Sequence, residues 1–539
     1  MSKVLKLIET KYSIGSLIVN NYRFTKPDKF MFPYSNNARI ILDRAIEDVK
    51  KHFGKEILIM ADVDFDGVAS AYIMRKFIVE SCGGRGVSVC INKERKHGID
   101  NRYVNFINGI SGEKYSLFII VDSSTNCIEQ IKNIKKDVLV IDHHEIEVSL
   151  DELVGNTADG NYCIINNEAV DYSIGNREKY VNMSGAQVVY EFLRYEYNRP
   201  DVEEMMLYNW VAVSLYSDVI DVDNETNQWY LQESLDTFNI EITLMRMMES
   251  ICRGAAKLNK NSISFNLVPT VNSAIRMENG LELLDIVMHN PENMRKLLDY
   301  KKKQREIVNN VMISGRWQEY GEVVTMDLTE FTESIGMEGL VANKLVNKFR
   351  KTSIVYRNDS VYNDGIHIRG SFRLNTNMDG FRKWLNGCIG WTAEGHNNAF
   401  GFTCDCGISK VVDAYVYYMI NATNIDERYI TDKSVADEFV IDIKNSESMK
   451  EFITNGYLAQ VALVNSRMTK DNQKIYLRVP NTDDNVKIHE EGTVKYIEMR
   501  VAGLYAISFR DIWVGKGYLY LYPDYHDGID IFVDRQVVN

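Results

Sequence analysis

Acidic side chains and a histidine pair follow three short apolar runs of the sequence. The runs and the residues after them are Ile57–Met60 with Asp62, Asp64 and Asp66; Leu117–Val121 with Asp122; and Val138–Ile141 with Asp142, His143 and His144. Carboxylates crowded into one place repel each other unless positive charge lies between them. Oxygen ligands together with imidazole suit Mn²⁺ or Mg²⁺, and such a site can hold two ions roughly 3.5–4 Å apart. The chemistry that this predicts is hydrolysis of a phosphoryl ester, which needs no protein nucleophile.

Each of these groups also has a simpler interpretation when it is taken alone. The stretch from Asp62 to Gly67 opens like an EF-hand calcium loop, but Ile73 stands where that loop needs a bidentate glutamate. Asp122 precedes two serines and a threonine, so it could cap a helix. The pair of histidines carries little information by itself. The recurrence of acidic residues after three apolar runs favours a metal site over these alternatives.

The apolar runs are the elements that must bring the three groups together. With Val87–Ile91 they make four short apolar segments, which is typical of buried parallel strands. Between them, Val68–Val79 and Cys127–Ile134 carry apolar residues at helical spacing. Strands that alternate with helices predict a doubly wound α/β sheet, whose strands end at a common ligand crevice. Residues as distant in sequence as Asp62 and Asp142 are therefore expected to meet.

The rest of the chain suggests three further parts. We expect a catalytic α/β domain over residues 1–240, a helical connector over 241–315, a smaller α/β domain over 316–430 and an all-β domain over 431–539. Within the connector, the run Lys301–Lys303 is either a solvated helix face or a contact to a phosphate backbone. Turns are expected at Lys470–Asn472 and Gly515–Gly517. The C-terminal strands are expected at Phe439–Ile443, Tyr457–Val464, Lys474–Val479, Tyr505–Trp513, Tyr518–Tyr522 and Ile529–Val533.

Composition limits the classes of function. The formal net charge of −13 argues against a protein that holds nucleic acid over its whole surface, so any site for a polyanion must be local or assisted by metal. No run approaches the roughly 18 apolar residues of a membrane span, and Met1–Lys6 has no long apolar signal core. The 8 cysteines show no C-x-x-C spacing and are interpreted as reduced, buried thiols. We therefore expect a soluble, cytoplasmic protein without a membrane partner.

The ordered motifs resemble those of the DHH phosphoesterases and, within that superfamily, the RecJ single-strand DNA exonucleases. In the first domain, the stretch Asp62–Gly67 resembles the first DHH motif, and Asp122, Asp142-His143-His144 and Asp218 resemble the later ones. The stretches similar to the RecJ branch are Asn166, Met183–Ala186 and Asn272–Arg276. The stretches similar to the associated DHHA1 domain are Ile335-Gly336, Gly339–Ala342, Gly370–Arg373 and Gly395–Gly401.

This resemblance implies roles for individual residues. Metal ligation is implied for Asp64, Asp66, Asp122, His143 and Asp218. His144 would contact the scissile phosphate, Asp122 would serve the reaction directly, and Asp62 would be a further ligand or would support the ligands. Substrate contacts are implied for Asn166, Arg276, Arg373, Gly395 and His396. Gly395 has an alternative as a turn glycine, and Arg276 could instead join the two lobes through a buried ion pair.

Two departures from the family pattern bear on the branch and on the substrate. Met60 stands where the pyrophosphatase and small-oligonucleotide branches carry histidine, which favours the exonuclease branch. Glu394 replaces the first glycine of the pair expected before His396, so it places an acid near an implied phosphate contact.

The resemblance implies a 5′ to 3′ exonuclease that uses two Mn²⁺ or Mg²⁺ ions on single-stranded nucleic acid, with DNA as the expected substrate and no nucleotide cofactor. A phosphodiesterase for short oligoribonucleotides or cyclic dinucleotides would use the same metal site, and a DHH protein that binds without cutting is a third hypothesis. The β-rich tail could supply an OB-type nucleic-acid surface. In that tail, Tyr518, Tyr520 and Tyr522 alternate along one strand and either pack a barrel core or stack against bases.

Overall fold

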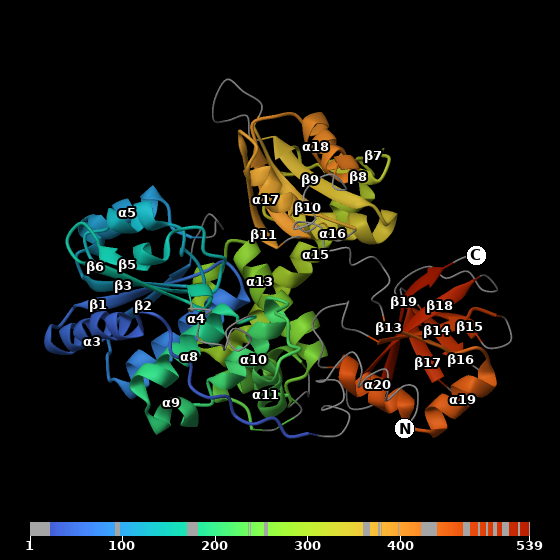
Figure 1. The fold of residues 1–539 in the computed structure, drawn as a ribbon, viewed down its shortest axis with the longest axis horizontal. Helices are drawn as coiled ribbons and strands as arrows, with labels where there is room; N and C mark the ends of the chain where they lie inside the picture. The colour runs from blue at the N-terminus through green and yellow to red at the C-terminus, as the bar shows by residue number, and fades with distance from the viewer. Residues whose placement is uncertain are drawn as a thin grey trace. The chain divides into compact units, whose positions relative to one another are not determined.

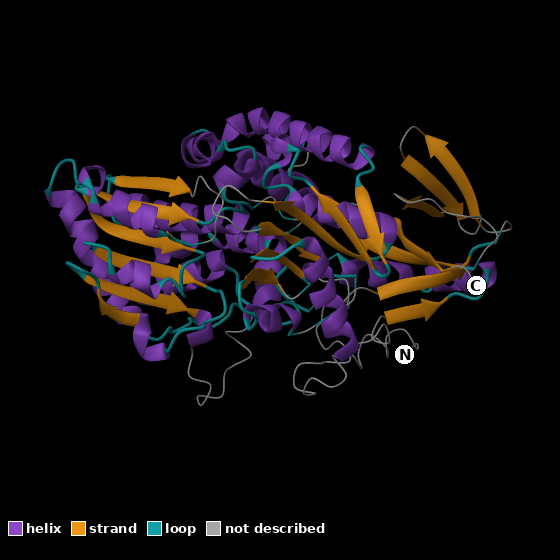
Figure 2. Ribbon diagram, turned by 90° about the horizontal axis from the view of Figure 1, so that it is seen from above, coloured by secondary structure: helices purple, strands orange, loops and turns teal. Residues whose placement is uncertain are grey.

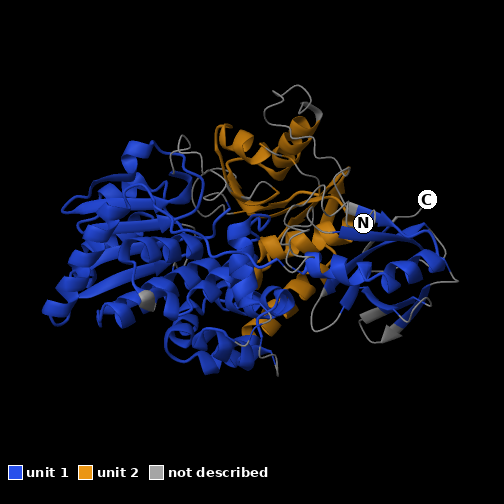
Figure 3. Ribbon diagram, turned by 60° about the horizontal axis from the view of Figure 1, so that its bottom comes forward, with its two compact units in different colours: residues 1–298, 438–539 blue, residues 299–437 orange. Residues whose placement is uncertain are grey.

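The computed structural model of the protein divides into two compact units, which are residues 1–298 with 438–539, and residues 299–437 (Figure 3). The residues described are 22–91, 98–169, 182–235, 237, 239–252, 257–358, 367–375, 378, 380–396, 398–421, 439–466, 475–482, 486–491, 494–499, 504–508, 517–525 and 529–537. Within this described part of the chain, none of the helices combines the length and the apolar character that a membrane span requires.

The first unit contains a six-stranded sheet in the order β2-β1-β3-β4-β6-β5 (Figures 1 and 2). Its strands are β1 (Glu56–Ala61), β2 (Val87–Ile91), β3 (Tyr115–Val121), β4 (Asp137–Asp142), β5 (Val154–Asn156) and β6 (Asn161–Asn166). All neighbours pair in parallel except β5, which runs antiparallel to β6. The parallel, doubly wound core that the sequence predicted is therefore confirmed.

Helices cover both faces of this sheet, which explains why the central strands are apolar throughout. On one face, side chains such as Leu58 and Phe118 form a core with α5 (Asn101–Asn108) and α6 (Ile128–Lys132). On the other face, α3 (Ser35–Lys51) packs across the strands, while α4 (Phe65–Lys76) contacts β1 and α8 (Gly185–Tyr197) contacts β4. The helix α4 is buried from Phe65 to Met74, so it lies inside the domain rather than on its surface.

The strand order places a topological switch point between β1 and β3. These strands are neighbours in the sheet, although β2 follows β1 in the chain and lies on its other side. Loops that leave the carboxyl ends of two such strands diverge and open the crevice in which α/β proteins bind ligands. Asp62 comes directly after β1 and Asp122 directly after β3. The fold therefore puts two of the predicted acidic groups at its natural ligand site.

A helical region continues this unit after the sheet. Its elements are α9 (Pro200–Glu204), α10 (Tyr208–Ser217), α11 (Glu225–Ser234), α12 (Ile242–Ile251), the π-helix η6 (Ser262–Leu267), α13 (Val268–Arg276) and α14 (Gly280–His289). The helix α10 is central to this region, since every residue from Asn209 to Tyr216 is buried. The ring of Trp210 stacks on Tyr72 of α4, with centroids 4.2 Å apart. This contact joins the helical region to the sheet.

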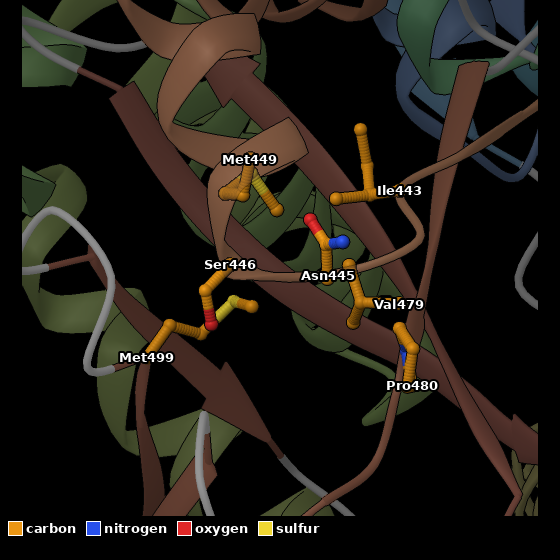
Figure 4. A pocket seen from close by; sticks show the side chains of 7 residues that line it. All are labelled: Ile443, Asn445, Ser446, Met449, Val479, Pro480 and Met499. Carbon is orange, nitrogen blue, oxygen red and sulfur yellow. The ribbon is translucent and has the colours of Figure 1, made fainter.

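The C-terminal part of this unit is a seven-stranded sheet in the order β13-β14-β18-β19-β17-β16-β15. Its strands are β13 (Phe439–Asp442), β14 (Ile475–Pro480), β15 (Val486–Glu491), β16 (Val494–Met499), β17 (Leu504–Ser508), β18 (Tyr518–Tyr525) and β19 (Ile529–Val537). Tyr522 is buried and Tyr518 and Tyr520 are partly buried. A shallow depression beside α19 (Ser446–Thr454) has no ionisable side chain among its lining residues (Figure 4), so it is not a candidate for catalysis.

One strand predicted in this part is wrong. The segment Tyr457–Val464 lies in the helix α20 (Tyr457–Asn465), which follows α19 (Ser446–Thr454). A short apolar run fits a buried strand and a buried helix equally well. Here Gly456, with φ of 74°, sits at the N-cap and directs the chain into a helix. The turn predicted at Lys470–Asn472 lies outside the described residues, as do Gly515 and Lys516 of the other turn.

The second unit is a smaller mixed sheet in the order β11-β12-β10-β9-β8-β7. Its strands are β7 (Trp317–Tyr320), β8 (Val323–Asp327), β9 (Thr352–Asn358), β10 (Ile368–Arg373), β11 (Trp391–His396) and β12 (Ala399–Cys404), and its helices are α15 (Leu298–Ile313), α16 (Glu338–Phe349), α17 (Phe381–Asn386) and α18 (Ile408–Asn421). Phe372, Phe381 and Phe400 form its core. On α15, Lys302 and Lys303 are exposed.

The cysteine prediction needs correction. Cys404, at the end of β12, forms a disulfide with Cys406. A separation of two residues lets the turn after the strand bring both sulfurs together, and sequence spacing gave no reason to expect that geometry. The other six cysteines are free, and of these only Cys163 is fully buried.

Candidate metal centre

The first acidic group lies in the turn between β1 and α4. Asp62 is buried, with 2% of its surface exposed. Asp64 is the N-cap of α4 and accepts a hydrogen bond from the amide of Gly67 at 3.1 Å. The helix begins here because this cap satisfies one of its free amides. Capping and metal binding do not exclude each other, since a carboxylate keeps further lone pairs.

Asp66 points at the amino end of α8 and at α10. Its carboxylate accepts hydrogen bonds from the amides of Gly185 at 2.8 Å and Ala186 at 2.9 Å, and from the Ser214 hydroxyl at 2.6 Å. Free amides at a helix start and the positive end of the helix dipole both favour a negative charge. These contacts fix the orientation of Asp66 and favour its charged form, although burial raises the pKa of Asp66 overall.

Asp122 is held in an unusual backbone conformation. Its φ is +64°, which costs energy for a residue other than glycine and recurs at functional sites. Its amide donates to the Ile141 carbonyl at 2.8 Å, which ties the end of β3 to β4. Gly185 of α8 packs directly on the carboxylate, since a Cβ there would lie 2.3 Å from Asp122 Oδ1. The side chain is 3% exposed and cannot turn away from the cluster without disturbing α8.

The ring of His143 faces the carboxylates with its second nitrogen. His143 Nδ1 lies 2.8 Å from the Met183 carbonyl, so it carries the proton and donates. The other ring nitrogen, Nε2, lies 3.2 Å from Asp122 Oδ1 and 3.6 Å from Asp218 Oδ2. A nitrogen lone pair aimed at carboxylate oxygens is repulsive unless positive charge lies there. That charge is either a proton on the ring or a bound cation.

Asp142 supports the two histidines. Its Oδ1 accepts from the amides of His143 at 2.8 Å and His144 at 3.2 Å, and it lies 2.7 Å from His144 Nδ1. Its Oδ2 accepts from the amide and the hydroxyl of Thr125 at 3.0 and 2.7 Å. Five donors therefore use both oxygens of a buried carboxylate. The His144 ring is 48% exposed.

Asn166, the last residue of β6, is hydrogen-bonded to both turns that hold Thr125 and His144. Its amide nitrogen donates to the Thr125 hydroxyl and to the His144 carbonyl, both at 2.9 Å. Its side-chain oxygen accepts from the Glu168 amide at 2.8 Å. The side chain is 1% exposed, and both of its N–H groups are already used. These contacts favour positioning of His144 as the part played by Asn166.

The proton affinities of the cluster show how strongly its charges oppose one another. Burial and the neighbouring carboxylates, Asp62 foremost, raise the pKa of Asp64 to about 7. Burial, with the carboxylates of Asp66, Asp64 and Asp62, holds the pKa of Asp122 well above its usual range. Burial works against a charged His143 ring, but Asp218 and Asp66 outweigh it and raise its pKa overall. A buried cluster that takes up protons so readily is suited to hold divalent cations in their place.

The side chains form overlapping sets with metal-ligand spacing. In each set, one ligand atom from every residue lies within 4.8 Å of the others; the sets are Asp62, Asp64 and Asp122; Asp66, His143 and Asp218; and Asp122, His143 and His144. Oxygen with one imidazole nitrogen suits Mn²⁺ and Mg²⁺. The donor set therefore fits divalent cations, and sharing of Asp122 and His143 between sets suits two neighbouring ions.

The structure also places the remaining residues that the sequence singled out. Asp218 is the C-cap of α10 and lies with Asp66 and His143 in one of the sets with metal-ligand spacing. Arg276 is the last residue of α13 and is partly buried. Arg373, Gly395 and His396 belong to the second unit, where Ala399 pairs with Arg373 on one side and with His396 on the other. Gly395 has a φ of +125°, which only glycine adopts readily.

Three supporting contacts were not predicted from the sequence. They are the Ser214 hydroxyl on Asp66, the Met183 carbonyl on His143 and the Thr125 hydroxyl on Asp142. Ser214 lies in a largely apolar stretch of α10, which is a weak sign of a buried polar contact. A backbone carbonyl leaves no sign in the sequence at all.

Known proteins share both the first domain and the wider architecture of this chain. Residues 56–216 match the model of the DHH family, N-terminal domain. The structure is similar to RecJ of Thermus thermophilus in complex with Mn²⁺, with a TM-score of 0.68 and 13% identity over all of this chain and 77% of that one. A manganese-bound exonuclease RecJ gives a TM-score of 0.52 at 16% identity, over 75% of this chain and 98% of that one.

Two curated relatives extend the similarity at the level of sequence. One is a Bacillus subtilis (strain 168) protein provisionally named SPbeta prophage-derived single-strand DNA-specific exonuclease YorK, and the other is its counterpart from Bacillus phage SPbeta. Each is 24% identical over 403 residues, which are 67% of this chain. The chain covers 65% of the length of these relatives.

Residues 56–216, which hold most of the acidic cluster, are therefore similar to the DHH family, N-terminal domain. The fold of the chain is RecJ-like, with a second α/β unit and an additional C-terminal sheet.

Proposed function

We propose that the protein is a metal-dependent phosphodiesterase that degrades single-stranded DNA as a 5′ to 3′ exonuclease. The observation that carries this proposal is the convergence of Asp122, His143 and Asp218 on one point, with a ring nitrogen 3.2 and 3.6 Å from the carboxylate oxygens. Acceptor atoms around a common point repel one another unless a cation lies between them. Divalent cations held by carboxylates are common in enzymes that hydrolyse phosphodiesters. The DHH family match and the exonuclease names of the curated relatives support the same class of reaction.

The residues divide between two expected cations, with Mn²⁺ as the leading candidate. Asp62, Asp64 and Asp122 would hold one, while Asp66, His143 and Asp218 would hold the other. Two ions held by these residues would supply an activated water and positive charge for the phosphate oxygens. The protein keeps the ligands in place through the amino end of α8, which orients Asp66, and through the Met183 carbonyl, which orients His143.

His144 would donate to a phosphate oxygen. Burial works against a charged ring, but the Asp142 carboxylate 2.7 Å away outweighs it and raises the pKa of His144 to about 9. Asp142 thus holds the proton on Nδ1 and orients the ring, so that Nε2–H would donate to the substrate. A donor aimed at charge that develops during the reaction is worth about 10²–10³ in rate.

Substrate contacts away from the metal centre are proposed for Arg276 and for three residues of the second unit, Arg373, Gly395 and His396. A guanidinium suits a phosphate because it donates in a planar fork. Arg373 is oriented within its unit by hydrogen bonds from Nη1 to the Ser371 hydroxyl and the Phe372 carbonyl, both 2.7 Å. Glycine at 395 keeps the backbone close to β12, where a Cβ would meet the Ala399 carbonyl at 3.0 Å.

The test is a cleavage assay with purified full-length protein and Mn²⁺. End-labelled single strands, duplexes, dinucleotides and cyclic dinucleotides are offered separately, and 5′ and 3′ labels report polarity. We expect progressive loss of long single strands from the 5′ end. Asp122→Ala should abolish turnover while the circular dichroism spectrum stays that of the wild type.

Other outcomes would redirect the proposal. Cleavage of only the short substrates would favour a phosphodiesterase of oligoribonucleotides or cyclic dinucleotides. Binding of single strands without cleavage would favour a DHH protein that has a purely binding function. Near wild-type activity of Asp122→Ala would refute the metal assignment.

A further inference from the structure

The carboxyl end of α20, in the C-terminal sheet domain, meets the helical region of the same compact unit. Lys260 Nζ donates to the Asn465 carbonyl at 2.9 Å, and Tyr216 Oη donates to the Ser466 carbonyl at 3.3 Å. Both carbonyls lie where α20 ends, and the last carbonyls of a helix lack partners within it. Cations and hydroxyl donors are favourable at this end because the helix dipole is negative there.

Lys260 is more than a surface contact. Its side chain is 15% exposed and also donates to the Tyr522 hydroxyl at 2.7 Å. Asp524, which is 4% exposed, lies 3.9 Å from the ammonium group. A largely buried ammonium is tolerated only where hydrogen bonds and opposite charge replace water. These buried hydrogen bonds and this ion pair are typical of a stable contact between domains. We call this contact between the C-terminal domain and the helical region the joint.

Tyr216 connects this joint to the metal centre. It is buried on α10, and α10 ends at Ser217 with Asp218 as its C-cap. One half-turn earlier on the same helix, Ser214 donates to Asp66 at 2.6 Å. The end of α10 thus brings three roles together. Ser214 supports the proposed ligand Asp66, Tyr216 contacts the C-terminal domain, and Asp218 is itself a proposed ligand.

We propose that Tyr216 and Lys260 are positioning residues through which the C-terminal sheet domain holds the end of α10, and with it Asp66 and Asp218, in the geometry that binds metal. This inference rests on the proposed metal-dependent function. It assigns to the C-terminal domain a part in assembling the metal centre, apart from any contact that this domain makes with nucleic acid.

The test uses the whole chain with Tyr216→Phe, Lys260→Met, and the double variant Lys260→Met/Asp524→Asn, which also removes the buried carboxylate charge that faces Lys260. Tyr320→Phe and Lys51→Met, at exposed positions on other elements, are matched controls. Mn²⁺ affinity and stoichiometry are measured by titration calorimetry. Turnover is measured on a long single strand and on a small chromogenic phosphodiester of thymidine, which has one scissile bond and no strand beyond it.

We expect Lys260→Met or its double variant to weaken at least one Mn²⁺ about tenfold, which is the effect of losing a charge-assisted hydrogen bond, and Tyr216→Phe to do so about threefold. The kcat for the small substrate should fall in parallel, and the controls should match the wild type. If only the KM for long single strands rises, while Mn²⁺ affinity and small-substrate kcat stay unchanged, the inference is overturned. A wild-type protein that binds no Mn²⁺ would instead end the proposed function, so the two failures are distinguishable.

Discussion

Replacing Gly185 by alanine is expected to abolish most of the activity without unfolding the helix that Gly185 begins. Gly185 has an ordinary helical backbone and is the first residue of α8. Its importance lies in the close approach to Asp122, because an added Cβ would lie 2.3 Å from Oδ1 and 2.7 Å from Cγ of that residue. Asp122 cannot simply rotate away, since its backbone is held at a φ of +64° between β3 and β4.

The size of the effect comes from this geometry. Ordinary van der Waals contact starts at 3.4 Å, so the carboxylate must retreat by about 1 Å, the difference between 3.4 and 2.3 Å. A displacement of this size at a reacting centre costs about 100-fold in kcat. Alanine is the better helix former by about 0.5–1 kcal/mol, which offsets part of the strain in the free energy of unfolding. Activity should therefore fall much further than stability.

The assay compares kcat on a labelled single strand with Mn²⁺ and the thermal unfolding temperature of the same samples. Gly407→Ala is the matched control, because no described heavy atom lies within 4 Å of the Cβ that it would add. This control should keep wild-type kcat. A Gly185→Ala protein with full Mn²⁺-dependent activity would show that the position of Asp122 does not set the rate, and the assignment of Asp122 as a ligand would fall.

Two further predictions concern the histidine and the protons of the site. His144→Asn should lower kcat about 100-fold and leave Mn²⁺ affinity unchanged, because the ring is proposed to serve the phosphate; a large loss of Mn²⁺ affinity in calorimetry would make His144 a ligand instead. The pKa of Asp64 is raised to about 7, so the metal must displace a proton from this carboxyl at pH 6 but not at pH 8. For one displaced proton, Mn²⁺ affinity should rise about tenfold over the whole interval from pH 6 to pH 8. The raised pKa also means that the metal-free protein loses stability as pH rises from the carboxylate's usual range toward 7, since its folded state binds the extra proton. The increase in unfolding temperature caused by Mn²⁺ should accordingly be larger at pH 8 than at pH 6, and a pH-independent increase would contradict the cluster's role.

The position of the metal centre could be predicted from sequence because parallel strands constrain the residues at their carboxyl ends. Each buried strand ends at the same edge of the sheet, so Asp62 and Asp122 had to lie near each other once β1 and β3 were neighbours. The part played by Asp218 came only from the family resemblance. It follows a helix rather than a strand, and nothing in its local sequence marks the end of α10 as part of the site.

The sequence by itself determined the type of fold and most of the charged groups at its crevice, because hydrophobic periodicity and the alternation of strands with helices are properties of the chain itself. The tertiary structure decided which atoms face one another. The contact of Gly185 with Asp122 and the Ser214 hydroxyl on Asp66 depend on the packing of α8 and α10 against the strand ends. The use of both N–H groups of Asn166 within the protein depends on the neighbouring turns that hold Thr125 and His144. It also decided that Tyr457–Asn465 is a helix, since a short apolar run has no preference until its neighbours supply one.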